Sequence, residues 1–303
     1  MTMRILLVHN PDAGDEEAEP DELMKTLALA GYKVVYQSSK KEKKLRKALK
    51  ARHDLVLVAG GDGTVGKVAR RLVGRKLPLS VLPSGTANNL ARTLGFCAPA
   101  KKLVGQLTKG ERAGFDVGRA RGPWGKCYLF EGFGAGLFAD HLYEYKRKAR
   151  GEKSGSKAQQ MRRHVRELCR RLRTHKARAW KIELDGKDFS GRYLLWQGMN
   201  IRSVGPVLTL APEAATDDGQ FEFVGAREDD RELLFKHLEA RLAGRKPKFP
   251  LPSHRFKKMR LCWEDGPLHL DDEVWPAEDE KRPGRCAIKI AVKPSALQIW
   301  RTD

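Results

Sequence analysis

The chain has 303 residues, 41% of them hydrophobic, so it is long enough to form two globular domains with separate cores. Its formal net charge of +21 predicts a polyanionic partner, either nucleic acid or an anionic membrane surface. It has no run of eighteen apolar residues and no signal segment, and its five cysteines include no Cys-x-x-Cys pair. We therefore expect a cytoplasmic protein without a membrane span, disulfide framework or zinc site.

Strands and helices alternate over residues 1–120. Apolar runs predict strands at residues 4–8, 32–37, 54–59 and 77–82, with helical spacing between them. Asp21 is expected to cap the first helix. This order predicts an α/β domain with a doubly wound parallel sheet.

Two glycine-rich turns each follow a strand and precede a helix. They are Gly60-Gly61-Asp62-Gly63-Thr64 and residues 83–89. Glycines let the backbone approach a ligand closely, and the start of a helix attracts phosphate. A carboxylate at Asp62 would repel a nucleotide unless it binds a metal ion or accepts a proton, although an ordinary helix cap also explains it. Turns after neighbouring parallel strands lie at one sheet edge, where such sheets bind ligands.

The alternation of strands and helices ends near residue 121. Short strands at residues 180–184, 192–200, 207–211 and 220–224, separated by turns, predict an antiparallel, β-sandwich-like second domain over residues 121–292. One basic helix interrupts them at residues 159–173. Its apolar stripe could pack in the core or lie on a membrane.

Basic residues concentrate in two segments. Residues 146–178 contain fourteen Lys or Arg and two acids, and residues 245–260 contain seven and no acid. Such clusters indicate a docking face for an anionic bilayer, with a solvated face as the alternative. Nucleic acid is not expected as the partner, because no recognition motif or aromatic platform accompanies the charge.

Three ordered motifs resemble the diacylglycerol kinase catalytic domain family, which includes bacterial lipid kinases, sphingosine kinases and ceramide kinases. They are HNPDAG at residues 9–14, GGDGT at 60–64 and PSGTANNLAR at 83–92, and the resemblance extends over nearly the whole chain. It implies that residues 293–303 return to the first domain. The chain departs from the family pattern at Ala13 and at Gly66-Lys67, where the family has Ser and Asn-Glu. Lys67 could itself contact phosphate.

The resemblance also implies roles for particular residues. ATP and Mg²⁺ are the expected cofactors, Asp62 meets the metal ion or the attacking hydroxyl, and Glu273 is the general-base candidate. Asp218 resembles part of a family turn that can hold a structural divalent ion, although a plain Asp-Gly hairpin explains it as well. The residues expected to bind ATP are Asn10, Gly60, Gly61, Gly63, Thr64, Gly85 and Thr86.

One further segment bears on the substrate. Residues 134–140 resemble the part of sphingosine kinases where an Ala-Asp pair places a carboxylate at the lipid head group, so Asp140 is the candidate for that role. The alternative is a helix cap. Ceramide offers a carboxylate more hydrogen-bond donors than diacylglycerol does, and we therefore expect a sphingoid lipid to be preferred.

The sequence thus predicts an ATP-dependent kinase of a neutral membrane lipid, bound peripherally to the inner face of a membrane. A soluble enzyme similar to NAD kinase is an alternative, because that family shares the GGDGT turn. A non-catalytic, nucleotide-dependent membrane-binding module is another, because Gly66-Lys67 departs from the pattern. The sequence does not indicate an oligomeric state.

Overall fold

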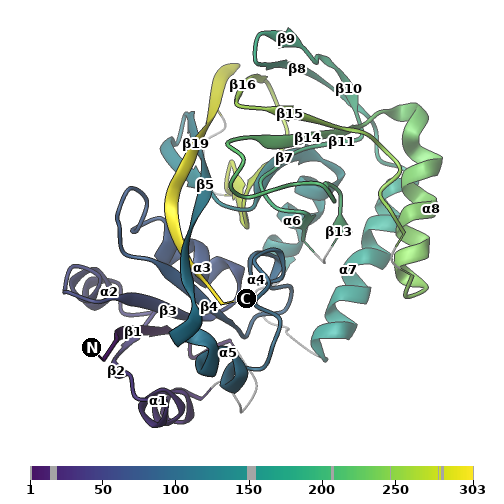
Figure 1. Cartoon of the computed structure of the whole chain (residues 1–303). Coiled ribbons are helices and arrows are strands. Elements are labelled where there is room, and N and C mark those ends of the chain that lie inside the picture. Colours follow the sequence, from purple (N-terminus) through teal and green to yellow (C-terminus); the bar gives the residue numbers. More distant parts are fainter. Residues whose placement is uncertain are drawn as a thin grey trace. The chain divides into compact units, whose positions relative to one another are not determined.

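The computed structural model describes residues 2–13, 19–148, 155–205, 208–245, 247–278, 280 and 283–302. Several expectations fall partly outside these residues: Gly14 of the first motif, residues 149–154 and Lys246 of the basic clusters, and Val207 of an expected strand. The chain divides into two compact units (Figure 1). The first unit is Met1–Val117 with Pro294–Asp303, and the second unit is Gly118–Lys293.

A parallel sheet forms the centre of the first unit. Its strand order is β4-β3-β1-β2, with the end of β19 beside β4. The strand β3 is buried at every position, as expected for a central strand covered on both faces. The bounds are β1 Arg4–His9, β2 Lys33–Ser38, β3 Leu55–Gly60, β4 Leu79–Pro83 and β19 Cys286–Arg301.

Short helices cover this sheet. The helix α1 (Pro20–Leu29) begins after Glu19 and places a proline at its start, which suits the helical backbone. Asp21 lies inside the first turn, so the predicted cap at Asp21 is wrong. The other helices are α2 Glu42–Ala48, α3 Asp62–Ala69, α4 Asn89–Thr93, α5 Ala100–Gln106 and the 3₁₀ helix η2 Leu107–Lys109.

Antiparallel strands build the second unit. One sheet has the order β15-β14-β11-β7-β17-β18, and the strands β10, β8, β16 and the start of β19 pair in that order, with β9 on β8 and β6 on β5. The strand β5 begins in the first unit. The bounds are β5 Glu111–Gly122, β6 Gly125–Leu129, β7 Gly132–Gly136, β8 Arg178–Leu184, β9 Lys187–Asp188, β10 Gly191–Tyr193, β11 Leu195–Met199, β14 Phe221–Ala226, β15 Ser253–Phe256, β16 Lys258–Trp263, β17 Leu268–Leu270 and β18 Glu273–Trp275, and the separate pair is β12 Ser203–Val204 with β13 Leu208–Thr209.

An aromatic core fills the space between the strands of the second unit. Trp196 of β11 is fully buried and meets Trp180 of β8 edge-on, with ring centroids 5.5 Å apart. Phe223 of β14 stacks on the same indole at 6.3 Å. Such ring pairs add to the free energy of apolar burial. The predicted α/β fold with an antiparallel second part is therefore confirmed.

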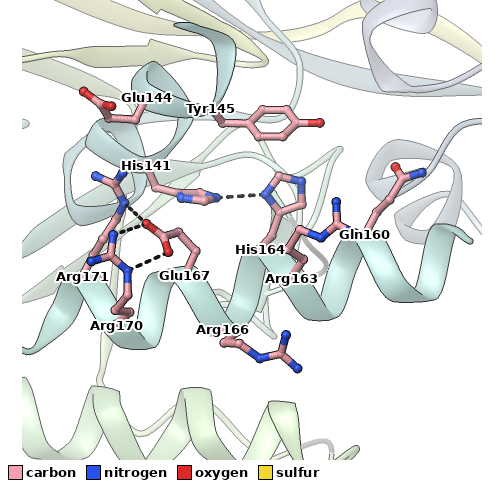
Figure 2. A pocket seen from close by; sticks show the side chains of 10 residues that line it. All are labelled: His141, Glu144, Tyr145, Gln160, Arg163, His164, Arg166, Glu167, Arg170 and Arg171. Atoms are coloured by element: carbon pink, nitrogen blue, oxygen red, sulfur yellow. Dashed lines mark hydrogen bonds and ion pairs between the residues drawn. The ribbon is translucent and has the colours of Figure 1, made fainter. Parts of the chain in front are cut away.

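Three helices cover the other face of the six-stranded sheet. They are α6 (Leu137–Lys148), α7 (Lys157–Leu172) and α8 (Arg231–Leu242), and the 3₁₀ helix η3 (Glu228–Asp230) leads into α8. The apolar stripe of α7 is buried at Val165, Leu168 and Leu172, so it packs in the core rather than lying on a membrane. The polar side chains of α6 and α7 frame a pocket (Figure 2).

The hairpin β17–β18 turns at Asp271, which has a left-handed backbone with φ of 54°. The sequence assigned no role to this residue, yet its buried carboxylate accepts hydrogen bonds from the amides of Phe130, Glu131 and Gly132 at 2.9 to 3.2 Å. Nδ1 of His269 lies 3.0 Å from the carbonyl oxygen of Asp271. Burial lowers the pKa of His269 to about 4, so the ring is neutral at pH 7.

This buried histidine makes stability depend on pH. The folded state binds fewer protons at His269 than the unfolded state, whose pKa is about 6.5. Its contribution should be complete above pH 6.5 and should fall as the pH drops towards 4, by up to about 1.4 kcal/mol per pH unit. Urea unfolding at a series of pH values, for the wild type and for His269→Gln, would measure this slope. Equal slopes for the two proteins would contradict the assignment.

Candidate active site

Three motif loops lie at one edge of the first unit's sheet. Asn10 follows β1, Gly61 and Asp62 follow β3, and Gly85 lies just after β4. Because these strands are parallel neighbours, their carboxyl ends share an edge. The Asn10 side-chain amide donates a hydrogen bond to Oγ1 of Thr64 at 3.1 Å, which joins the first motif to the second.

The two glycine turns touch through their backbones. A Cβ atom placed on Gly85 would lie 2.4 Å from Cα of Gly61, and one placed on Gly61 would lie 3.0 Å from Cα of Gly85. A Cβ on Gly60 would lie 2.7 Å from Cβ of Thr64. A larger residue at Gly85 would collide with the backbone of Gly61, and one at Gly60 would collide with Thr64 of its own turn. These glycines are therefore required by the protein's own packing as well as by any ligand.

Asp62 joins the two turns. It is the first residue of α3, and its Oδ2 and Oδ1 accept hydrogen bonds from the amides of Asn89 and Leu90 at 2.9 and 3.0 Å. The carboxylate therefore caps α4 rather than its own helix. Carboxylate oxygens are ligands that Mg²⁺ prefers. The site thus fits the metal ion that the resemblance implies, while the role of Asp62 towards it stays a prediction.

The second turn is held by Asn88, whose role the sequence did not indicate. Its backbone is left-handed, with φ of 51°, which asparagine tolerates better than most residues. Its side chain accepts from the amide of Gly85 and donates to the carbonyl oxygen of the same residue, both at 2.9 Å. Thr86 is exposed at the tip of the turn. The only sequence signal for Asn88 is an asparagine in a short turn before a helix.

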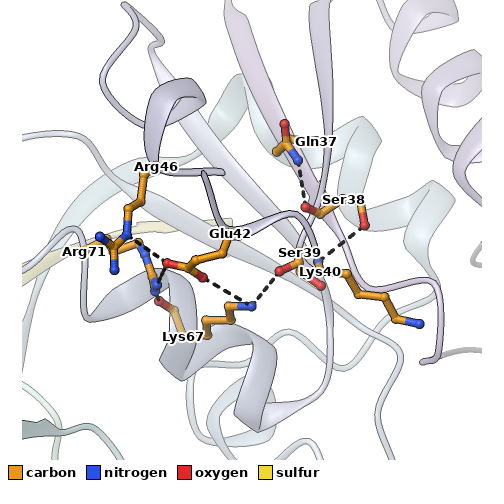
Figure 3. A network of polar contacts seen from close by, with 8 residues as sticks. All are labelled: Gln37, Ser38, Ser39, Lys40, Glu42, Arg46, Lys67 and Arg71. Atoms are coloured by element: carbon orange, nitrogen blue, oxygen red, sulfur yellow. Dashed lines mark hydrogen bonds and ion pairs between the residues drawn. The ribbon is translucent and has the colours of Figure 1, made fainter. Parts of the chain in front are cut away.

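Lys67 has protein partners in this structure. Its Nζ donates to the carbonyl oxygen of Ser39 at 2.6 Å and lies 3.5 Å from Oε2 of Glu42 (Figure 3). Arg71 and Arg46 also bind Glu42, and Arg71 contributes most to lowering the pKa of Glu42 to about 2. The ammonium group is held against β2 and α2, so the structure gives no support to a phosphate contact by Lys67.

Asp140, in the second unit, also has a partner that the sequence did not predict. It lies in the first turn of α6, 15% exposed, and accepts two hydrogen bonds from the guanidinium of Arg178 at 2.9 and 3.1 Å. Nδ1 of His175 lies 3.6 Å away. A bidentate arginine satisfies a carboxylate well, so Asp140 does not need the donors of a lipid head group. The alternative of a cap is wrong too, because α6 begins at Leu137.

Glu273 and Asp218 both lie at the surface, and each has a contact within the protein. The side chain of Glu273 is 65% exposed and accepts a hydrogen bond from Nζ of Lys146 at 3.1 Å, a surface ion pair of small energy. Oδ1 of Asp218 accepts from the amide of Gln220 at 3.0 Å. No group of three or more His, Cys, Asp or Glu side chains placed for a metal ion occurs among the described residues. Metal binding by Asp218 therefore stays a prediction.

The basic clusters are partly neutralised by acids. Glu167 binds both Arg170 and Arg171, and Glu222 binds Arg255 from another strand at 3.2 Å. Local counting along the sequence therefore overstates the free charge of these segments. In the described part of the chain, no helix is long and apolar enough to cross a membrane.

The parallel sheet with linked glycine turns at one edge defines a nucleotide-binding type of α/β unit. Residues 4–120 match the diacylglycerol kinase catalytic domain, so the resemblance that the motifs predicted is confirmed for this part of the chain.

Relatives and solved structures agree with this assignment. The chain is 27% identical over 237 residues to a diacylglycerol kinase of Bacillus subtilis (strain 168), covering 73% of each chain. It is 24% identical over 284 residues to a diacylglycerol kinase of Staphylococcus carnosus (strain TM300), covering 90% of this chain and 89% of the relative. The crystal structure of a diacylglycerol kinase from Bacillus anthracis str. Sterne shares the fold, with a TM-score of 0.70, 18% identity, and coverage of 98% of this chain and 96% of that chain.

The contact between the glycine turns can be tested directly. Gly85→Ala should lower the free energy of unfolding by about 1–3 kcal/mol, because the new methyl group meets the backbone of Gly61. Gly105→Ala, in α5 with open space around it, is the matched control and should be neutral or stabilising by up to about 1 kcal/mol. Urea denaturation measures both. Equal effects would show that the turns do not depend on this contact.

Proposed function

We propose that this protein is an ATP-dependent lipid kinase, which transfers the γ-phosphoryl group to a hydroxyl of a neutral membrane lipid. The linkage of the three motif loops at one sheet edge carries this proposal, because Asn10, Asp62 and the two glycine turns form a single hydrogen-bonded unit. The family match over residues 4–120 supports it. Relatives that carry the name diacylglycerol kinase cover most of the chain.

Phosphoryl transfer needs donors for the phosphates, a divalent ion and a carboxylate near the attacking hydroxyl, and little covalent chemistry from the protein. When bound, ATP supplies the phosphoryl group and Mg²⁺ offsets its charge. The turns at Gly60–Thr64 and Gly85–Thr86, with Asn10, would hold the nucleotide, and Asp62 would hold the metal ion. Glu273, with an exposed carboxylate, would accept the proton of the lipid hydroxyl.

We assign diacylglycerol as the acceptor and withdraw the expected preference for ceramide. That preference assumed a carboxylate at Asp140 in need of hydrogen-bond donors, and Arg178 already provides two. The names of the relatives point the same way. The extra hydroxyl and amide of ceramide therefore have no known partner among the candidate residues.

We further propose that the protein reaches its lipid by reversible binding to an anionic membrane surface. Each Lys or Arg near such a surface contributes about 1 kcal/mol, so the charges left after internal pairing suffice for peripheral attachment. The attraction is screened beyond about 10 Å at 0.1 M salt, and attachment should weaken as salt rises.

One assay separates the possible activities. The purified protein is incubated with labelled ATP, Mg²⁺ and mixed micelles that contain diacylglycerol or ceramide, and in parallel with NAD. We expect label in the phosphorylated product of diacylglycerol, and less in that of ceramide. Label in NAD alone would indicate an NAD kinase, and no label in any product would indicate a non-catalytic module. Either of these results would overturn the proposed function.

Asp62→Asn should lower kcat more than ten-fold, a loss above about 1.4 kcal/mol in transition-state stabilisation, because a neutral amide attracts a metal ion less strongly than a charged carboxylate does. Asp54→Asn is the control. Asp54 directly precedes the first residue of β3, far along the strand from the glycine turn. Its Oδ2 accepts one hydrogen bond from the amide of Arg4.

Unfolding free energies of both variants are measured as well, since Asp62 also caps α4. The catalytic role holds if Asp62→Asn is folded, binds ATP and is inactive. Retention of more than about a tenth of the wild-type kcat would reject it.

A further inference from the structure

A pocket of about 400 Å³ lies between α6 and α7, and no residue assigned to phosphoryl transfer lines it. His141 and Tyr145 line it from α6, and Arg163, His164 and Arg166 line it from α7 (Figure 2). The rings lie close together, with the centroids of Tyr145 and His164 4.5 Å apart. The pocket therefore combines aromatic walls with a basic rim.

The charges on this rim are not balanced. The acid Glu167 is used by Arg170 and Arg171, and Glu144 is used by Arg147 at 2.8 Å. Within the described parts of the chain, neither Arg163 nor Arg166 has an acidic partner. These two residues are three positions apart on α7, and both line the pocket. Two guanidinium groups are thus available at the mouth of one pocket.

The wall of the pocket contains a buried nitrogen without a partner. Nε2 of His141 lies 3.0 Å from Nδ1 of His164, so one proton joins the two rings. His141 is only 5% exposed, and its Nδ1 has no hydrogen-bond partner. Burial is the main cause that lowers the pKa of His141 to about 4, so the ring is neutral at pH 7. A buried polar atom left unpaired is unfavourable.

We propose that this pocket binds the phosphomonoester head group of a lipid, which is the class of product that the proposed kinase would make. A phosphomonoester carries a charge of about −1.5 to −2 and three acceptor oxygens, which matches two free guanidinium groups and their forked donors. A phosphodiester lipid carries one charge and fewer free oxygens, so it matches less well. The identity of the lipid as a product rests on the proposed function, whereas the binding itself does not.

The walls suit the remainder of such a lipid. Tyr145 is 38% exposed at the pocket, and the alkyl stems of Arg163 and Arg166 add apolar surface to its lining. These groups can contact the backbone of the lipid next to its phosphate. The pocket would then retain the protein on membranes that already contain product, in addition to the general attraction of its positive charge for an anionic bilayer.

Vesicle sedimentation without ATP tests the proposal. Phosphatidylcholine vesicles are prepared with phosphatidate, and a second set contains enough phosphatidylglycerol to match their surface charge. We expect binding to the phosphatidate vesicles to be about ten-fold tighter, which corresponds to about 1.4 kcal/mol. Equal binding to the two sets would overturn the proposal, because charge alone would then explain attachment.

The matched variants are Arg163→Gln with Arg166→Gln, against Arg162→Gln. Arg162 lies on the same helix and is exposed, but it does not line this pocket. The pair should lose the preference for phosphatidate, and Arg162→Gln should keep it while weakening binding to both vesicle types equally. All three substitutions are on exposed positions and should leave the fold unchanged by circular dichroism. The same loss of preference in Arg162→Gln would indicate a diffuse surface and reject the pocket.

The source of the phosphate is tested by NMR of the His141 and His164 ring protons. Short-chain phosphatidate should shift both signals in the wild type and not in the Arg163/Arg166 variant, and inorganic phosphate at the same concentration should shift them little. Equal shifts from inorganic phosphate would overturn the assignment to a lipid. Neither measurement requires turnover, so a chain that fails the kinase assay could still pass this test, and the two failures remain distinguishable.

Discussion

The contact between the backbones of Gly61 and Gly85 is the constraint on which the arrangement of the first unit's sheet edge depends. The two turns approach closely at Gly61 and Gly85, where a side chain would meet the facing backbone. Asp62 holds the turns together by accepting hydrogen bonds from the amides of Asn89 and Leu90 at the start of α4. Asn10 adds the loop after β1 to the same unit through Thr64. The position of each proposed nucleotide-binding group is therefore set by its neighbours before any ligand binds, which favours preorganised binding.

The alternation of strands and helices was predictable from the sequence, because apolar periodicity and glycine turns are local signals. The same kind of pattern located the apolar stripe of α7, but it left core packing and membrane binding both open. The partners of charged side chains were not predictable in this way. Asp62 binds amides at positions 89 and 90, and Asp140 binds a guanidinium at position 178. Such pairs depend on which elements the tertiary fold brings together, and no local pattern encodes them.

The unpredicted partners of charged side chains also change the conclusions about function. The expectation of a ceramide acceptor rested on one carboxylate read from a local resemblance, and the pairing of Asp140 with Arg178 removed its basis. The total number of basic residues also has to be corrected for ion pairs before it indicates a binding surface. Ion pairs with acids elsewhere in the chain reduce the free charge of the clusters, so the residues left unpaired, Arg163 and Arg166 among them, are more informative than the total.

The path of β19 has a consequence for synthesis of the chain. This strand begins in the second unit, where it pairs with β16, and ends in the first unit, where Ile299 lies opposite Leu79 of β4. The β4 edge of the parallel sheet therefore stays open while the ribosome makes the whole second unit. An open, apolar strand edge is a template for pairing with other chains. Folding of the first unit therefore cannot be completed until the end of β19 has been made, and during that interval the open edge is available for pairing with other chains.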